Sequence, residues 1–132
     1  MIDGEVKIFS RVHGRVASKC APKMFVSTAI TEKPTAFPAG CLIEISNITD
    51  TGRQSSTPIE NFAVITYQLE VYATTKNKCR EVYAEADEEM ISMNFNRISG
   101  AYMDNAGNTK VFRYVARYEA VMDKDGNIYR RT

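Results

Sequence analysis

The side chains most often used in catalysis and metal binding are scarce in this sequence. It contains one histidine, His13, and three widely spaced cysteines, Cys20, Cys41 and Cys79. Because there is no second histidine, sites built on a histidine pair are excluded. The cysteines and His13 could still meet as a Cys₃His zinc site, but paired spacings such as CxxC are absent. Small core or surface thiols are the simpler interpretation.

Other catalytic patterns are equally weak. A cysteine nucleophile with His13 as its base has no local motif behind it. Neither GxGxxG nor GxxxxGK(S/T) occurs, so the sequence predicts no phosphate-binding loop. The acids Glu85, Asp87, Glu88 and Glu89 lie together on a predicted helix, where such a group is usually a solvated face. We therefore predict a protein that is not an enzyme and that has no cofactor and no metal.

The totals are those of one globular domain. The chain has 132 residues, a net charge of +1 and 44% hydrophobic residues, so a buried core is expected and nucleic-acid binding is not. An odd number of spaced cysteines favours reduced thiols in a cytosolic setting. No apolar run is long enough to cross a membrane, and no signal-peptide core is visible.

The strongest structural signal is the stretch FAVITYQLEVYA, residues 62–73. Its odd-numbered positions are apolar and its even-numbered positions are mixed, which is the pattern of a half-buried strand. At about 3.3 Å per residue it would span about 40 Å, which is more than twice a typical strand. We expect the apolar face to pack under two helices and the excess length to reach another protein.

The remaining elements are expected on both sides of this strand. An amphipathic helix is predicted over about 3–17, with Asp3 as N-cap, and a second helix over about 76–93. Alternation predicts strands at 25–30, 41–47, 95–102 and 110–122, with a short edge strand at 128–129. The predicted fold is α+β, an antiparallel or mixed β-sheet with two helices packed on one face. Within a single domain, 1–132, we expect an N-terminal helix (1–22), strands with a long polar loop at 47–60 (23–74), a helix (75–93) and C-terminal strands (94–132).

Two charge patterns suggest contacts with other subunits. The helix at 76–93 begins with basic residues and carries its acids toward its C-terminal half, which opposes the helix dipole. Either solvent screens these charges, or they pair with opposite charges on another copy of the chain. The last long strand carries Arg113, Arg117 and Glu119 among valines, which suggests a covered outer face. Because the two signs lie on opposite elements and look unpaired within the chain, a heterologous contact that closes into a ring is expected.

The order of segments resembles a known family. A Phe37-Pro38 turn leads into CLIEISN, and after a polar loop come ENFAVITYQLEVYA and the helix KNKCREVYAEADEEM. The chain then closes with Phe95-Asn96-Arg97, a turn and VFRYVARYEAVMD. From about residue 37 to residue 130 this pattern resembles the tail terminator or tail-completion proteins of long-tailed bacteriophages and phage-derived tail-like particles.

The resemblance implies a non-enzymatic structural protein of the virion tail and neck, assembled in the cytoplasm of a host bacterium. Such proteins form a ring, expected to be hexameric, that caps the tail tube, ends its polymerisation and joins it to the neck. The implied partners are the chain itself, the tail tube protein, the neck or head connector protein and, in a contractile tail, the sheath protein. No membrane is involved, and DNA is met only by passage through the lumen.

Candidate contact residues follow from the charges and the long loop. For the subunit interface these are Glu85, Asp87, Glu88, Arg113, Arg117, Arg130 and Arg131. For contact with the tail or neck they are Asp50, Arg53 and Gln54. The alternatives are another small virion component, such as a head-completion or tail tube protein, and a small cytosolic ligand-binding domain or enzyme.

Overall fold

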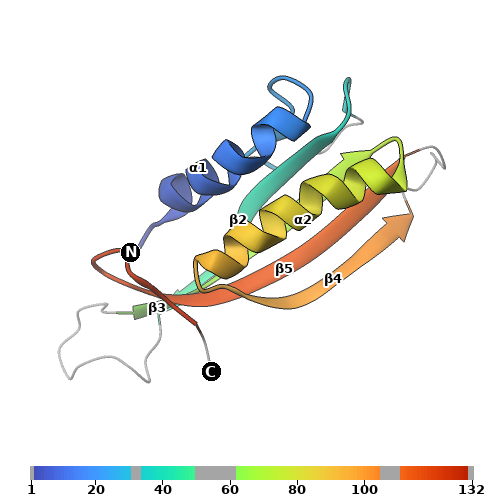
Figure 1. Cartoon of the computed structure of the whole chain (residues 1–132). Helices are drawn as coiled ribbons and strands as arrows, with labels where there is room; N and C mark the ends of the chain where they lie inside the picture. Colours follow the sequence, from blue (N-terminus) through green and yellow to red (C-terminus); the bar gives the residue numbers. More distant parts are fainter. Residues whose placement is uncertain (1, 31–33, 50–61, 105–110, 131–132) are drawn as a thin grey trace, which may run out of the picture.

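The computed structural model describes residues 2–30, 34–49, 62–104 and 111–130 (Figure 1). The elements in chain order are α1 (Glu5–Val16), the short 3₁₀ helix η1 (Ala17–Lys19), β1 (Phe25–Val26), β2 (Ala39–Thr49), β3 (Phe62–Ala73), α2 (Lys76–Ser92), β4 (Asn96–Asp104), β5 (Phe112–Asp123) and β6 (Ile128–Tyr129). None of the helices described is long and apolar enough to cross a membrane.

The strands form one mixed sheet with the order β1-β2-β3-β5-β4, and β6 pairs with β5. The β1–β2 pair is parallel and the other pairs are antiparallel. Both helices lie on the same face of the sheet, which curls around them (Figure 1). The α+β fold with two helices on one face, predicted from the sequence, is confirmed.

β3 is the central strand, and its bounds are those that the alternating pattern predicts. It pairs with β5 without a break, from Phe62 opposite Asp123 to Ala73 opposite Phe112. The helix-facing side chains of β3 are all at most 1% exposed and join the core with residues of both helices. Burying each large aliphatic side chain of this set contributes about 1.5–3 kcal/mol. The members on β3 are Ala63, Ile65, Tyr67, Leu69, Val71 and Ala73.

β2 contains a bulge that changes which side chains face the helices. Its register with β3 shifts between Glu44 and Ser46, so Ile45 has no partner opposite and is 40% exposed. In a regular strand, residues three apart point to opposite faces. With one extra residue inserted, Glu44 and Asn47 both face the helix side, opposite Tyr67 and Ile65. The bulge therefore brings two polar side chains under the start of α1.

Several element boundaries differ from the sequence-based prediction. α1 begins at Glu5 with Gly4 as its N-cap, whereas Asp3 precedes the cap and accepts a hydrogen bond from the Glu5 N–H. Gly4 packs so tightly against Met122 that a Cβ there would lie 2.3 Å from Met122 Cε. β1 contains two residues instead of the expected six. Most of the predicted loop at 47–60 lies outside the described residues, but β2 extends through Thr49.

Candidate functional site

The acids of α2 lie against the arginines of α1. Arg15 contacts Glu85 at 2.7 Å, Glu88 at 3.0 Å and Glu89 at 3.2 Å, and Arg11 contacts Glu89 at 2.7 Å. The hydrogen bonds and charges of these acids, led by Glu88, raise the pKa of Arg15. The prediction that these acids are unpaired within the chain is therefore wrong. The acids in the C-terminal half of α2, which oppose its dipole, are explained by the basic helix beside them.

Asp87 has partners of its own inside the chain. It accepts a 2.6 Å hydrogen bond from the buried Tyr118 hydroxyl and lies 3.4 Å from Arg97. Burial, followed by this hydrogen bond, raises the pKa of Tyr118. Next to this contact, the rings of Tyr83 and Tyr114 stack with their centroids 3.8 Å apart. Asp87 thus ties α2 to β5 within the chain, and its role in a subunit interface stays a prediction.

Arg113 belongs to a charged cluster on the face of the sheet opposite the helices. Its guanidinium donates to Glu70, which also accepts from the Tyr72 hydroxyl at 3.2 Å and from the Cys41 thiol at 3.5 Å. Burial alone would raise the pKa of Glu70, but the hydrogen bond and charge of Arg113 outweigh it and lower that pKa. Glu70 is 5% exposed, so this pair is a structural ion pair.

The other predicted contact residues are less constrained. Arg117 is exposed and donates a 3.0 Å hydrogen bond to Gln68 on the neighbouring strand. Arg130 makes a long contact of 3.5 Å with the backbone oxygen of Ile91. The remaining predicted contact residues, Asp50, Arg53, Gln54 and Arg131, lie outside the described residues.

Both helices that the structure describes lie on the other side of the sheet from Arg117, so neither covers the face that carries it (Figure 1). Val64 and Val115 on this face are only partly buried, and Ile48, opposite Val64, is 63% exposed. Next to Val64 the rings of Phe62 and Tyr129 meet edge to face, with centroids 6.4 Å apart, whereas Val115 lies opposite Glu70 toward the other end of β3. The expected half-apolar outer face is thus present on β2, β3 and β5.

The cysteines and His13 do not form a site within the described part of the chain. Burial raises the pKa of Cys20 to about 11, of Cys41 to about 12 and of Cys79 to about 11. A nucleophilic or metal-binding cysteine needs the opposite shift, toward the thiolate. The His13 ring packs near Phe9 and Phe25, with centroid distances of 5.5 Å and 6.3 Å.

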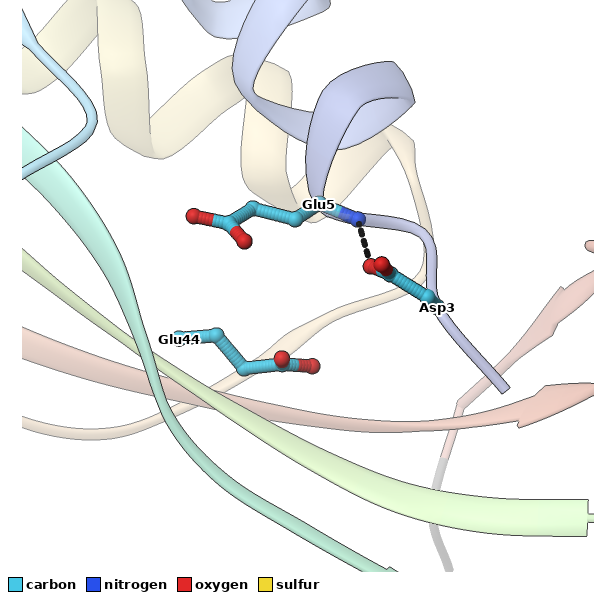
Figure 2. A group of neighbouring side chains, drawn as sticks. All are labelled: Asp3, Glu5 and Glu44. Atoms are coloured by element: carbon cyan, nitrogen blue, oxygen red, sulfur yellow. Dashed lines mark hydrogen bonds between the residues drawn. The ribbon is translucent and has the colours of Figure 1, made fainter. Parts of the chain in front are cut away.

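Among the described residues, the one cluster of three or more possible metal ligands is made of Asp3, Glu5 and Glu44. One carboxylate oxygen from each lies within 4.8 Å of the others, and Figure 2 shows the three side chains gathered between the start of α1 and β2. Burial, followed by the charges of Asp3 and Glu5, raises the pKa of Glu44. This group was not predicted from the sequence, in which Asp3 was assigned as a helix cap and Glu44 lies within the strand predicted at 41–47.

Two buried polar atoms, Asn47 Oδ1 and the Tyr67 hydroxyl oxygen, lie beside this cluster. Asn47 donates through Nδ2 to the Ile2 backbone oxygen at 2.6 Å and to Glu44 at 3.3 Å, while its buried Oδ1 has no partner. Tyr67, paired with Glu44 across β2 and β3, is fully buried, and its hydroxyl has no hydrogen bond of good geometry. Burial, and then the charges of Glu44, Glu5 and Asp3, raise the Tyr67 pKa.

Comparison with known proteins adds no family to this description. No protein-family model matches the chain, and neither does any curated protein sequence.

Proposed function

We propose that this chain is a structural component of a phage tail or a tail-like particle. It assembles into a ring, expected to be a hexamer, that caps the tail tube, stops its polymerisation and joins it to the neck or head connector. In a contractile tail the same ring also contacts the sheath. The proposal combines the resemblance in segment order with the fold that carries those segments.

The observation that supports it most is the helix-free face of the sheet. A sheet face on a free-standing domain is expected to be polar, yet this one displays Ile48, Val64 and Val115 on three adjacent strands. Arg117 adds an exposed cation to the same face. Such a surface fits a second copy of the chain, because ring contacts need apolar area together with charges that set the orientation.

The intrachain ion pairs narrow the set of interface candidates. Glu85 and Glu88 both pair with Arg15, Asp87 pairs with Arg97, and Arg113 pairs with Glu70, all within the same chain. Among the described residues, the Arg117 guanidinium donates only to the neutral amide of Gln68. We therefore assign the orienting charge of the subunit contact to Arg117, and contact with the tail or neck to the loop that contains Asp50, Arg53 and Gln54.

Ring formation is tested by measuring the mass of the purified chain alone and after mixing with tail tubes, with electron microscopy of both samples. Rings at tube ends are expected. Extended tubes would instead identify a tube protein. A monomer that does not bind the tail tubes would favour a ligand-binding domain or an enzyme.

The role of the helix-free face is tested with Ile48→Asp and Arg117→Glu. Each is expected to reduce the fraction of chains in rings at least tenfold, while the circular dichroism of the monomer is unchanged. The matched control is Ile91→Asp, an equally drastic change at a 37% exposed position on the helix side. Assembly unaffected by both substitutions would remove this face from the proposal.

A further inference from the structure

We infer that Asp3, Glu5 and Glu44 form a calcium-binding site that fastens the start of α1 to the sheet. This inference is independent of the proposed function, and it departs from the sequence-based expectation that the protein binds no metal. It rests on two separate observations: the three gathered carboxylates, and two buried side-chain oxygens beside them that make no hydrogen bond of good geometry.

Within the described residues, no lysine or arginine forms an ion pair with Asp3, Glu5 or Glu44. The nearest lysine in sequence, Lys7, instead donates to the Gly126 backbone oxygen at 3.0 Å. The positive end of α1 accounts for Asp3 and Glu5, but it does not explain why the bulge turns Glu44 toward them.

The two buried oxygens point independently to a ligand. Tyr67 Oη and Asn47 Oδ1 are the buried side-chain atoms without a hydrogen-bond partner in the described part of the chain, and both lie next to Glu44. The orientation of the Asn47 amide is fixed because both partners of its Nδ2 are acceptors. A buried polar group without a partner costs about 1–3 kcal/mol, so two at one place indicate that something else normally binds there.

The donor atoms select the kind of ion. Carboxylates, an amide oxygen and a hydroxyl are hard oxygen ligands, which suit Ca²⁺ or Mg²⁺ and disfavour zinc or copper. Ligands on opposite sides of Ca²⁺ lie about 4.6–5.2 Å apart, whereas those of Mg²⁺ lie about 4.0–4.2 Å apart. The carboxylate oxygens lie within 4.8 Å of one another, so all three can reach one ion, and Ca²⁺, whose coordination geometry is flexible, accepts such a set more readily than Mg²⁺. Asp3 is exposed, which leaves room for waters to complete the coordination.

Each residue then has a distinct role. Glu44, held by Asn47, supplies the ligand from the sheet, and Asp3 and Glu5 supply those from the start of α1. Asn47 Oδ1 offers a neutral oxygen on the sheet side. The Tyr67 hydroxyl is placed to donate to a water on the ion, which would satisfy the only polar atom of an otherwise apolar strand face.

Terbium provides a direct probe, because Tb³⁺ replaces Ca²⁺ and emits when a nearby tyrosine is excited. The chain contains no tryptophan, so the signal reports tyrosine alone. We expect sensitised emission that Ca²⁺ displaces, and at least a tenfold loss of emission in Tyr67→Phe. Tyr129→Phe, an exposed tyrosine of the same sheet, is the matched control and should keep the signal. Absence of emission, or equal loss in both variants, would overturn the site.

Thermal unfolding separates a metal site from a purely structural cluster. We expect Ca²⁺ to raise the Tm of the wild-type chain, with a smaller effect of Mg²⁺. Glu44→Gln should raise the Tm of the EDTA-treated protein, because it removes repulsion, and abolish the increase caused by Ca²⁺. Glu88→Gln, which changes an exposed acid of α2, should leave the Ca²⁺ effect intact. An equal Ca²⁺ effect in wild type and Glu44→Gln would refute the site, and a stronger response to Mg²⁺ would refute its assignment to calcium.

Discussion

Glu70 and Glu44 are carboxylates on adjacent strands, yet their surroundings act on them in opposite ways. Glu70, on the helix-free face, receives Arg113, and its pKa is lowered despite burial. Glu44, on the helix side, meets Asp3 and Glu5, and burial, followed by the charges of these two acids, raises its pKa. One charge is neutralised within the chain, whereas the other lacks a cation among the described residues. The contrast separates the Glu70 cluster, whose charges are paired within the chain, from the Glu44 cluster, which we propose as a cation site.

Removing Arg113 should have the largest effect of any change in this comparison. In Arg113→Met the buried Glu70 carboxylate loses its counter-charge, and we expect the free energy of unfolding to fall by about 2–4 kcal/mol. Urea denaturation measures this loss. The matched control is Arg117→Met on the same strand, whose guanidinium is exposed and meets only an amide, so a change below about 0.5 kcal/mol is expected. Equal losses in the two variants would show that Glu70 does not depend on Arg113.

The pH dependence of stability should differ in sign between the two acids. Because the Glu70 pKa is lowered, its contribution is present above the unfolded value near pH 4.3 and is lost as the pH falls through the folded pKa. Because the Glu44 pKa is raised, its contribution is present below that value and is lost as the pH rises through the folded pKa.

At pH 7 without metal, Glu70→Gln should therefore destabilise the chain, and Glu44→Gln should stabilise it by about 0.5 kcal/mol after solvent screening. Urea denaturation from pH 7 down to pH 3 should show both differences shrinking toward zero. Two profiles of the same sign would contradict the assignment of opposite environments.

The smallest effect expected is on thiol chemistry. Cys41 is fully buried beside Glu70, and burial, followed by the Glu70 charge, raises its pKa to about 12. Cys20 is partly exposed, with a pKa raised by burial to about 11. In the folded chain at pH 8, iodoacetamide should modify Cys20 before Cys41, and both more slowly than in urea, as read by peptide mass spectrometry. Faster modification of Cys41 would mean that the Glu70 cluster opens readily.

Patterns within one element were predictable from the sequence, and contacts between elements were much less so. The alternation at 62–73 predicted β3 with its bounds, because one face of the strand is apolar at every position. The charges along α2 led to the wrong prediction that its acids are unpaired within the chain. Their partners, Arg11 and Arg15, lie about 70 residues earlier in the chain. The group around Glu44 depends on the β-bulge between Glu44 and Ser46, and no residue type in CLIEISN indicates a bulge. Without the bulge, simple alternation would separate Glu44 and Asn47 onto opposite faces.

The pairing of β3 with β5 also has a consequence for how the chain folds during synthesis. The central strand cannot pair with β5 until residues that lie 39 (Ala73 to Phe112) to 61 (Phe62 to Asp123) positions later have been synthesised. Contacts so distant in sequence form slowly, and until they form, one backbone edge of the most apolar strand is open to pairing with other chains. A ribosome-bound chain that ends after α2 should therefore be aggregation-prone, and the sheet should close only when β5 has emerged.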